Sequence, residues 1–467
     1  MNSGYADVLV GLQYGDEGKA RVVDMIADQY DIIARFNGGA NAGHTVETKE
    51  GGKVALNQIP SAIFYPDKIL YIGTGCVINI EKTTAEIKKI EAMGITLKGR
   101  LKISSQASVV QPHHILMDEA MGKNIGTTKN GIGPCYADRA YRMLEDRLVN
   151  VRIGDLVDDA DKYFAIIEKN LTATSKLYNL EPKADMNAIK EAFEYLKQFV
   201  ELDTLYIQKQ VESGKSVLFE GAQAVMLDVA KGSVPFVTSS NTVAAAAYFG
   251  GDLSPNYHRK TIGVAKAVMS RVGHGPFASE YGGMQSEEYT LESNEDGSPK
   301  FGRQVEKESD IAALIVSEDE FEMGKAMRIY SGEYGTVSTR PRRIGSLDLV
   351  QLKYAIRMNG VDELFITKCD ILQHYSETKL NKLPLVISYD LDGTEIDYVP
   401  GSVDPYYRVK CLRENLDSFS EDLTAMKDHS ELPESLIKYL DRIGEFCGCK
   451  MIGIGVGPER EQYVKLP

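Results

Sequence analysis

The sequence predicts an α/β fold with a large, mostly parallel central β-sheet and flanking helices. Short apolar runs alternate along the chain with stretches of helical periodicity. Several of these runs lead directly into glycine-rich or polar loops. Alternating strands and helices favour a mostly parallel sheet that is covered on both faces. Because ligands of such sheets bind beyond the carboxyl ends of the strands, we expect these loops to form one shared site.

The expected elements begin with a strand, a turn and a helix. Val8–Val10 is a short apolar run, and residues 21–30 have helical spacing. Residues 81–93 are also predicted to be helical, and Asp185 is placed to cap a helix whose apolar face lies within residues 189–200. Further strands are expected at residues 31–36, 68–75, 216–223, 363–370 and 451–461.

Length, charge and cysteine usage limit the class of protein. We expect a single domain spanning residues 1–467, with an acidic surface insertion at about 286–324. The net charge of −14 argues against a general nucleic-acid or membrane-surface binder. Six cysteines without a CxxC pair suit a reducing compartment. No signal peptide is visible, and no run approaches the roughly 20 apolar residues of a membrane span. We therefore expect a cytoplasmic protein.

The loop after the first strand is a candidate phosphate site. The loop contains Gly15 and ends in Gly18-Lys19. Its glycines let backbone N–H groups approach an anion at the N-terminus of the following helix, and Lys19 can add a positive charge. The standard phosphate loop reads G-x-x-x-x-G-K-[ST], but here Ala20 follows the lysine and has no hydroxyl to hold Mg²⁺. An acid, Asp16, lies inside the loop instead. By itself the pattern is equally consistent with an ordinary strand–helix turn that exposes a lysine.

Two further loops supply polar side chains. Residues 36–45 (FNGGANAGHT) are half glycine and alanine, which permits close approach of the backbone to a ligand. They contain Asn41 and His44, and a histidine beside a phosphate loop is a candidate proton donor. Residues 125–142 add hydroxyl groups, glycines and arginines. Taken singly, a loop histidine is more often structural, and a surface arginine is more often only solvated.

The C-terminal half contains two stretches that suit a nucleotide. Residues 338–345 (STRPRRIG) concentrate three arginines in an acidic protein, and arginine forks suit carboxylates and phosphates. Residues 367–370 (TKCD) follow a predicted strand and resemble the N/T-K-x-D guanine reader of GTP-binding proteins. In such a reader, Asp370 accepts hydrogen bonds from N1–H and the 2-amino group of guanine. This four-letter pattern gains weight from the strand before it and from the phosphate-type loop.

Nine motifs resemble, in order, those of the adenylosuccinate synthetase family. They are GDEGKA, NGGANAGHT, GTTKNGIGPCYADRAYR, FEGAQ, VPFVTSSN, VGHGPF, STRPRRIG, TKCD and GVGPERE. The match runs from residue 8 to about 462. The resemblance implies GTP- and Mg²⁺-dependent ligation of L-aspartate to IMP through a 6-phosphoryl-IMP intermediate, with adenylosuccinate, GDP and phosphate as products of this step in purine biosynthesis. It also implies a P-loop-like, GTP-dependent ligase fold and a homodimer.

The resemblance assigns roles to individual residues. Asp16 removes the N1 proton of the purine and ligates Mg²⁺, the backbone carbonyl of Gly43 is a second metal ligand, and His44 is the general acid. The IMP-binding positions match Asp16, Asn41, Thr128, Arg142, Gln223, Thr238 and Arg340, with Arg142 reaching across the dimer interface. The GTP-binding positions match Gly15, Gly18, Lys19, Gly43, Thr45, Arg342, Lys368, Asp370, Gly455 and Gly457. The aspartate-binding positions match Thr336, Val337, Ser338, Arg340 and Arg342.

Several positions depart from the usual family pattern. Lys129-Asn130 replaces a Gly-Arg pair whose arginine helps to engage aspartate. Thr339 replaces the glycine before the arginine cluster, and Ser346 replaces a tryptophan after it. These changes fall on the amino-acid side of the site. A missing charged hydrogen bond costs roughly 1.5–3 kcal/mol, which is enough to weaken aspartate binding or to change the amino acid.

Two other interpretations stay open. The same chemistry on dGMP would give a 2-amino-adenylosuccinate-type product, but relatives of that kind replace the acid at the Asp16 position with a small hydroxyl residue, so Asp16 favours IMP. Asp370 favours GTP over an adenine donor. The second alternative is a GTP-binding regulator without ligase activity. Such a regulator has no use for a second purine site, whose matching residues are Asp16, His44, Thr128, Gln223 and Arg340.

Overall fold

The computed structural model of the protein describes residues 4–41, 43–47, 53–121, 127–335 and 339–467. The chain forms two compact units. The first comprises residues 1–10, 19–223 and 238–260, and the second comprises residues 11–18, 224–237 and 261–467. The single-domain organisation expected from the sequence stays a prediction.

The first unit has a parallel arrangement of strands in the order β11-β7-β5-β2-β12-β1, and the pairings from β11 to β12 are parallel. Separate two-stranded pairs are β3-β4, β6-β8 and β9-β10. The strands are β1 (Ala6–Gly11), β2 (Ile32–Arg35), β3 (His44–Glu47), β4 (Lys53–Leu56), β5 (Ile69–Ile72), β6 (Val77–Ile78), β7 (Leu101–Ser104), β8 (Ser108–Val109), β9 (Met143–Leu144), β10 (Arg147–Leu148), β11 (Val200–Glu201) and β12 (Val217–Ala224).

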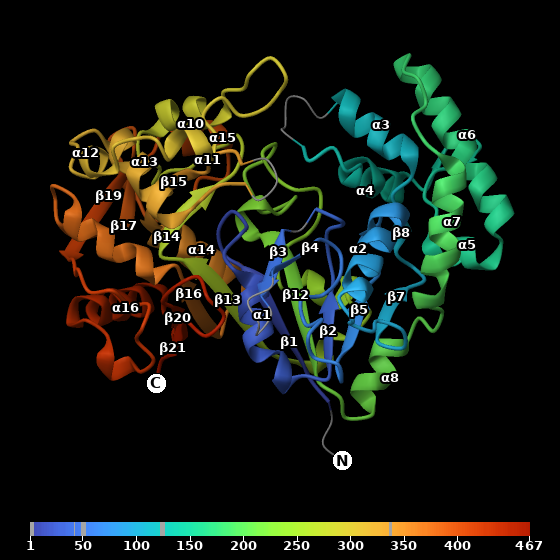
Figure 1. Ribbon diagram of the computed structural model, residues 1–467, viewed down its shortest axis with the longest axis horizontal. Coiled ribbons are helices and arrows are strands. Elements are labelled where there is room, and N and C mark those ends of the chain that lie inside the picture. The colour runs from blue at the N-terminus through green and yellow to red at the C-terminus, as the bar shows by residue number, and fades with distance from the viewer. Residues whose placement is uncertain (1–3, 42, 48–52, 122–126, 336–338) are drawn as a thin grey trace. The chain divides into compact units, whose positions relative to one another are not determined.

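Helices of the first unit begin at side-chain caps that the sequence supplies. Asn79 accepts the N–H of Lys82 at the start of α2, and Asp185 accepts two N–H groups at the start of α7. In Figure 1, α2 packs beside α7, and α3 packs beside α6. The α-helices are α1 (Lys19–Ile26), α2 (Ile80–Ala92), α3 (Pro112–Met121), α4 (Ile132–Tyr141), α5 (Ile153–Asp158), α6 (Ala160–Tyr178), α7 (Met186–Leu196), α8 (Tyr206–Glu212) and α9 (Ala246–Gly250).

The second unit contains two sets of strands. One has the order β13-β16-β20-β21, in which β13, β16 and β20 are parallel and β21 is antiparallel. The other has the order β14-β15-β17-β18 with β19 beside β17, and there only β15 and β17 pair in parallel. The strands are β13 (His258–Lys266), β14 (Val268–Arg271), β15 (Arg343–Asp348), β16 (Glu363–Thr367), β17 (Lys382–Leu391), β18 (Thr394–Ile396), β19 (Lys410–Asp417), β20 (Lys450–Gly455) and β21 (Tyr463–Lys465).

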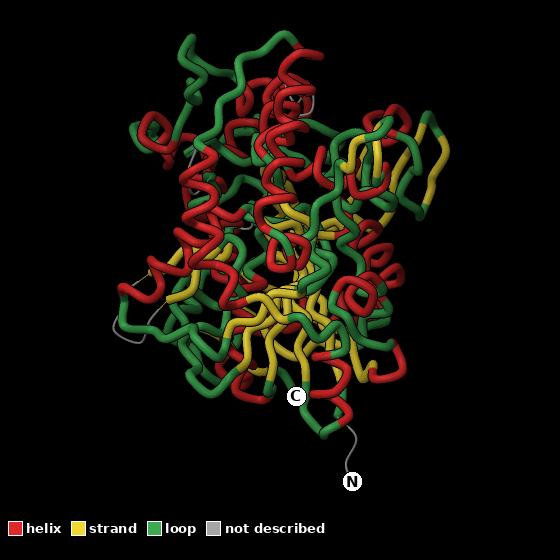
Figure 2. The backbone as a smooth tube through the Cα atoms, turned by 90° about the vertical axis from the view of Figure 1, so that its right-hand side faces the viewer, coloured by secondary structure: helices red, strands yellow, loops and turns green. Residues whose placement is uncertain are grey.

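Helices alternate with strands along the second unit too. Figure 2 marks the helices of the chain in red and its strands in yellow. Gly360 and Gly448 end α14 and α16 in the left-handed conformation that glycine adopts most easily. The α-helices are α10 (Gly283–Leu291), α11 (Arg303–Glu306), α12 (Ile311–Ile315), α13 (Glu320–Ser331), α14 (Leu349–Asn359), α15 (Val403–Arg408) and α16 (Glu434–Cys447), and the 3-10 helix η6 spans Cys369–Glu377.

The fold class expected from the sequence is confirmed: the chain is α/β, with mostly parallel strands and flanking helices. The expected strands appear as β1, β2, β5, β12, β16 and β20, and the expected helices as α1, α2 and α7. Within the described residues, no helix combines the length and apolar character that a membrane span requires.

The parallel strands place the predicted site loops at their carboxyl ends. In the first unit, β2 ends before the loop of residues 36–43, and β12 carries Gln223 at its end. In the second unit, β16 ends just before Lys368, and β20 ends at Gly455. This is the edge of a parallel sheet where ligands bind.

A buried carboxylate in the first unit supports the chain after β4. Glu86 of α2 accepts the backbone N–H groups of Asn57 (2.9 Å), Gln58 (2.9 Å) and Ile59 (3.2 Å). In Glu86→Ala these three donors lose their acceptor, and one unpaired buried donor costs about 1–3 kcal/mol. We expect urea unfolding to show a loss of about 3 kcal/mol or more. The exposed Glu81→Ala change in the same helix should cost less than about 1 kcal/mol; equal effects of both changes would contradict this role.

Candidate active site

The loop between β1 and α1 has an unusual backbone. Gly15 and Gly18 have φ angles of 88° and 86°, and Asp16 has a φ of 57°. A non-glycine residue is uncommon in this left-handed region, and such residues cluster at functional sites. The buried carboxylate of Glu17 accepts the N–H groups of Gln13 (3.2 Å) and Gly15 (2.8 Å). The loop is therefore held by its own acid, and the amide of Gly15 already has a partner.

Asp16 forms an ion pair with an arginine from the predicted aspartate loop. Its Oδ2 lies 2.7 Å from Nη2 of Arg342, and Nη1 of Arg342 lies 2.7 Å from Oε2 of Glu333. The side chain of Asp16 is 41% exposed, whereas that of Glu333 is 3% exposed. Arg342 therefore joins an accessible carboxylate to a buried one.

Glu333 is the centre of a buried charge cluster. Nζ of Lys266 lies 3.0 Å from its Oε2, and Nζ of Lys368 lies 3.5 Å from its Oε1. The hydroxyl of Ser270 also donates to Glu333 Oε2 (2.8 Å). Burial alone would raise the pKa of Glu333, but Lys266, Arg342 and Lys368 hold that pKa well below its usual range. Glu333 is thus an anion that fixes three cations, two of them at predicted GTP positions.

Two further GTP positions of the second unit lie against Thr367. A Cβ atom on Gly18 would lie 3.4 Å from Cγ2 of Thr367, and one on Gly455 would lie 3.4 Å from its Cα. The Thr367 hydroxyl donates to the carbonyl of Glu17 (2.7 Å). The opening loop, the TKCD segment and the last glycine loop therefore lie together. Asp370 is half-buried in η6, and a Cβ on Gly457 would clash with Gln462.

The first unit brings several predicted IMP positions to one place. Asn37 donates to the carbonyl of Ala222 and to the hydroxyl of Ser240, both at 3.2 Å. Asn41 Oδ1 accepts the N–H of Gly39 (3.3 Å). Because Ala222 precedes Gln223 and Ser240 follows Thr238 closely, the loop containing Asn41 lies beside both segments. A Cβ on Gly133 would lie 2.9 Å from Ser239 Oγ, so the start of α4 joins the same group.

The region around α4 contributes two more predicted residues. Thr128 Oγ1 accepts from Nδ2 of Asn130 (3.2 Å), at the position where the family pattern has an arginine. Arg142 follows the last residue of α4, is exposed, and has a φ of 65°. Its side chain is therefore presented to solvent by an unusual backbone conformation.

Some predicted positions are placed only in part. Lys19 is the first residue of α1 and is buried. Gly43 is exposed, and His44 and Thr45 lie in β3, although their side chains are not described. Thr336, Val337 and Ser338 lie outside the described residues.

Backbone conformation marks many of the predicted residues. Asp16, Arg142, Gln223 and Lys368 all have φ between 57° and 65°, and Thr339 has a φ of 54°. Sequence reasoning missed Lys266, Glu333 and Glu17 as site residues. The position of Lys266 at the end of the apolar run of β13 could have indicated a buried, functional lysine. In the sequence, Glu333 and Glu17 look like ordinary surface carboxylates.

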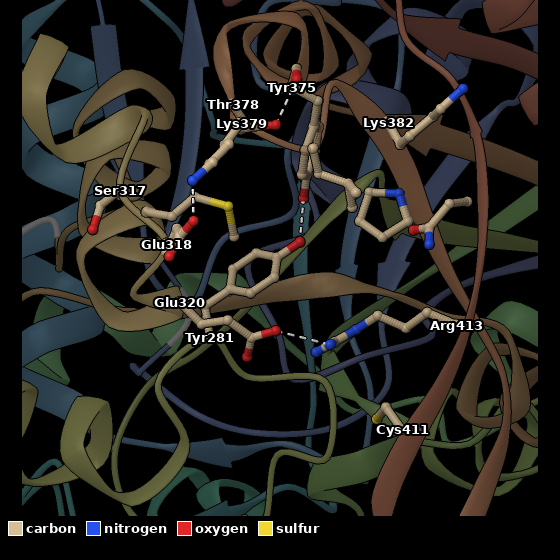
Figure 3. A pocket seen from close by; sticks show the side chains of 14 residues that line it. Tyr281, Ser317, Glu318, Glu320, Tyr375, Thr378, Lys379, Lys382, Cys411 and Arg413 are labelled. Carbon is tan, nitrogen blue, oxygen red and sulfur yellow. Dashed lines mark hydrogen bonds and ion pairs between the residues drawn. The ribbon is translucent and has the colours of Figure 1, made fainter.

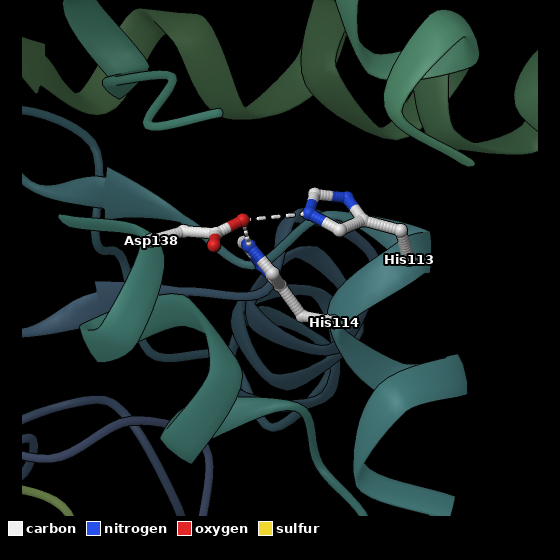
Figure 4. Close-up of side chains that lie close together, drawn as sticks. All are labelled: His113, His114 and Asp138. Atoms are coloured by element: carbon white, nitrogen blue, oxygen red, sulfur yellow. Dashed lines mark hydrogen bonds and ion pairs between the residues drawn. The ribbon is translucent and has the colours of Figure 1, made fainter. Parts of the chain in front are cut away.

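A second cluster, shown in Figure 4, has ligand atoms that lie close enough together to hold a metal ion. Nε2 of His113 and Nε2 of His114 lie 2.8 and 3.1 Å from Oδ2 of Asp138. Nδ1 of His114 accepts the N–H of Gln111 (2.9 Å), so its proton is on Nε2, which donates to Asp138. Burial lowers the pKa of His114 to about 4. The cluster therefore fits a structural link between α3 and α4 better than a metal site.

A cavity of about 510 Å³ in the second unit lies apart from the predicted site residues. Figure 3 shows the hydroxyls of Tyr281 and Tyr375 pointing at each other, 2.6 Å apart. Its cations are paired with acids: Arg413 with Glu320 at 2.9 Å, and Lys379 with Glu318. None of the residues that line this cavity is a predicted GTP, IMP or aspartate position.

A model of the adenylosuccinate synthetase family matches residues 8–464 of the chain. The chain belongs to the adenylosuccinate synthetase family. It is 44% identical over 461 residues to adenylosuccinate synthetase 2 of Cupriavidus pinatubonensis (strain JMP 134 / LMG 1197), covering 98% of this chain and 97% of the relative. It is 37% identical over 469 residues to adenylosuccinate synthetase of Streptococcus gordonii, covering 97% and 96%.

A solved structure agrees with this membership of the adenylosuccinate synthetase family. The fully ligated adenylosuccinate synthetase of Plasmodium falciparum aligns with a TM-score of 0.83 at 28% identity, over 99% of this chain and 100% of that one. Succinoaminodeoxyadenylate synthetase of cyanophage S-2L, bound to dGMP and dATP, aligns with a TM-score of 0.59 at 18% identity, over 100% and 96%. At that identity the likeness shows the fold alone.

The Glu333 cluster makes a stability prediction. In Glu333→Gln, the buried ammonium of Lys266 loses its carboxylate, and breaking a buried ion pair costs about 3–5 kcal/mol. We expect urea unfolding to show a loss of this size, and the double variant Lys266→Met/Glu333→Gln to recover part of it. Glu445→Gln on the exposed surface of α16 should change stability by less than about 0.5 kcal/mol. A Glu333→Gln protein as stable as the original would refute the cluster.

Proposed function

We propose that this protein ligates L-aspartate to IMP with cleavage of GTP, giving adenylosuccinate, GDP and phosphate. The observation that carries this is the position of Asp16, a partly exposed acid at a left-handed φ, paired with Arg342. A base that takes the N1 proton of a purine must be accessible and oriented, and the ion pair with Arg342 provides the orientation. The 6-oxygen can then attack the γ-phosphate, which turns a poor leaving group into a good one for displacement by the amine of aspartate.

The predicted GTP residues have arrangements that support phosphate and guanine binding. Arg342 Nε is buried and has no hydrogen-bond partner among the residues that the structure describes, so it can donate to a phosphate oxygen. Lys368 is fixed by Glu333 and donates to the carbonyl of Ser331 (2.8 Å). We propose that Asp370, next to this lysine, reads guanine, and that Gly455 and Gly457 let the backbone approach the nucleotide.

Mg²⁺ is the implied metal, and the proposed ligands are the Asp16 carboxylate and the Gly43 carbonyl. Asp16 fits a cation because its side chain is partly exposed and ends in a carboxylate, a ligand type that Mg²⁺ prefers. Gly43 is exposed, and a Cβ there would meet nothing within 4 Å, which leaves room for a ligand. When bound, the ion would neutralise charge on the phosphates of GTP. His44 is proposed as the general acid.

Two further proposals concern the assembly and its location. The exposed Arg142 is suited to reach a neighbouring subunit, which supports a homodimer with shared IMP sites. The six cysteines are all free, which supports a reducing cytoplasm.

One assay tests the reaction itself. The protein is incubated with GTP, Mg²⁺ and L-aspartate, and IMP, dGMP or no purine is added. We expect phosphate release and the absorbance change of adenylosuccinate only in the mixture to which IMP is added. Turnover only with dGMP would instead indicate the 2-aminopurine reaction, and GTP cleavage without any purine would indicate a GTP-binding regulator.

Removing the base should stop the reaction without unfolding the protein. Asp16→Asn keeps the shape of the side chain but cannot take a proton, and a general base contributes about 10²–10⁴-fold to rate. We expect kcat to fall by about 10³-fold, with an unchanged circular dichroism spectrum. The exposed Asp28→Asn change after α1 is the control and should keep normal activity. Substantial ligation by Asp16→Asn would exclude the base role.

The guanine reader makes a separate prediction. In Asp370→Asn, the side chain can no longer accept both the N1–H and the 2-amino group of guanine. Loss of a charged hydrogen bond of about 1.5–3 kcal/mol corresponds to about 10–100-fold in affinity. We expect the KM for GTP to rise by such a factor. We also expect the preference for GTP over ITP, measured as the ratio of kcat/KM values, to decrease. An unchanged preference for GTP over ITP would count against the assignment of Asp370.

A further inference from the structure

The acidic stretch expected as a surface insertion contains one fully buried acid. Helices α10, α11 and α12 and their connections form residues 283–315, here called the α10–α12 segment. Most of its charged side chains are exposed, but Glu306 is 0% exposed. A buried carboxylate is stable only when it is well paired. The partners of Glu306 therefore indicate what this segment holds.

Two partners of Glu306 belong to the flanks of the predicted aspartate loop. Arg328 of α13 donates to Glu306 through Nε (2.9 Å) and Nη2 (2.7 Å), which is a bidentate ion pair. The hydroxyl of Tyr334 donates to the same carboxylate (2.6 Å). The third arm of Arg328, Nη1, donates to the carbonyl of Arg342 (3.1 Å). Glu306 thus reaches the chain just before the loop through Tyr334 and the last residue of the loop through Arg328.

The backbone closes the loop between these two anchor points. Tyr334 and Pro341 form an antiparallel bridge, and the N–H of Gly335 donates to the carbonyl of Arg340 (2.8 Å). The N–H of Thr339 donates to the carbonyl of Gly335 (3.0 Å). These contacts form the base of the loop. The orientation of the Arg340 side chain therefore depends on how firmly the base of the loop is held.

Thr339 gives the segment a second point of contact. It has a φ of 54°, and a β-branched residue in this region is strained. Such strain persists only where the surroundings fix it. The N–H of Arg303, at the start of α11, donates to the carbonyl of Thr339 (3.2 Å). The α10–α12 segment thus contacts the loop base at a residue with a strained backbone.

The same segment also holds the side chain of Arg340. Its Nη1 donates to the carbonyl of Thr290 (3.1 Å), and its Nη2 donates to the hydroxyl of Ser293 (2.8 Å). These acceptors are uncharged. A carboxylate of a ligand is a stronger acceptor for a guanidinium than a carbonyl or a hydroxyl. Arg340 is therefore oriented by the segment through uncharged acceptors, for which the carboxylate of a substrate would be the stronger competitor.

We propose that the α10–α12 segment is the support of the amino-acid substrate loop, with Glu306 as a positioning residue for Arg340. This inference rests on the proposed function, because it takes aspartate as the substrate of that loop. Glu306 touches no substrate and acts through Tyr334 and Arg328. Its contribution should appear in aspartate binding and not in GTP binding.

Steady-state kinetics test the role of Glu306. Glu306→Gln and the milder Tyr334→Phe should each raise the KM for aspartate about tenfold, the effect of one weakened charged hydrogen bond. The KM for GTP should stay within about twofold, which a general loss of structure would not allow. Glu308→Gln, exposed in the same segment, is the control. An unchanged aspartate KM in Tyr334→Phe, the variant least prone to unfold, would overturn the proposal.

A charge at Ser293 tests the transfer of Arg340. Ser293→Asp places a carboxylate where the hydroxyl accepts from Arg340, so the guanidinium should be retained there and the KM for aspartate should rise about tenfold. Ser293→Asn has the same shape without the charge and should behave like the original protein. Ser293 is exposed, so neither change threatens the fold. Equal kinetics for the two variants would overturn the transfer step.

Hydrogen exchange separates this inference from the proposed function. In the ligand-free protein, the amides of Gly335 and Thr339 should exchange about tenfold faster in Tyr334→Phe, because the loop base opens more often. If the original protein does not ligate aspartate, the proposed function fails, and the exchange result still decides whether Glu306 supports the loop. Unchanged exchange would remove that support.

Discussion

The site depends on one buried carboxylate. Glu333 is almost completely buried and lies within ion-pair distance of Lys266, Arg342 and Lys368. Removing such charges from water is costly, and the arrangement is tolerable only because every buried charge has an opposite partner. A displacement of any one of the segments that carry these groups would leave a charge unpaired. The cluster therefore fixes the end of β13, the predicted aspartate loop and the TKCD segment relative to one another.

Arg342 connects Glu333 to the proposed catalytic base. Its guanidinium is anchored on the inaccessible Glu333 and presents its other side to Asp16, which is partly exposed. The proposed base thereby gains a defined direction, although it lies in a short loop with a strained φ. On the far side of the same loop, Glu306 plays a comparable part for Arg340. In both cases a buried acid is proposed to hold an arginine of the loop in a fixed orientation.

Much of the architecture followed from periodicity and from the family resemblance, because apolar runs and glycine loops are local signals. The strands that carry the site, such as β16 and β20, were predicted in the right places. The sheet built on β17 was not, since its pairings join segments far apart in sequence. Among the site residues, Asp16, Arg342 and Lys368 were expected, whereas Glu333 and Glu306 were missed. Residue type does not show whether a carboxylate is buried or solvated, and only its contacts in the folded protein distinguish the two.

The central claim is that Arg342, anchored on Glu333, orients Asp16 toward N1 of the purine. A crystal structure with IMP, Mg²⁺ and a non-hydrolysable GTP analogue measures this directly. The account predicts an Asp16 carboxylate oxygen about 3 Å from N1 of the purine, with the Arg342–Glu333 ion pair intact. A complex in which Asp16 faces away from the purine, or in which Arg342 has left Glu333, would contradict it.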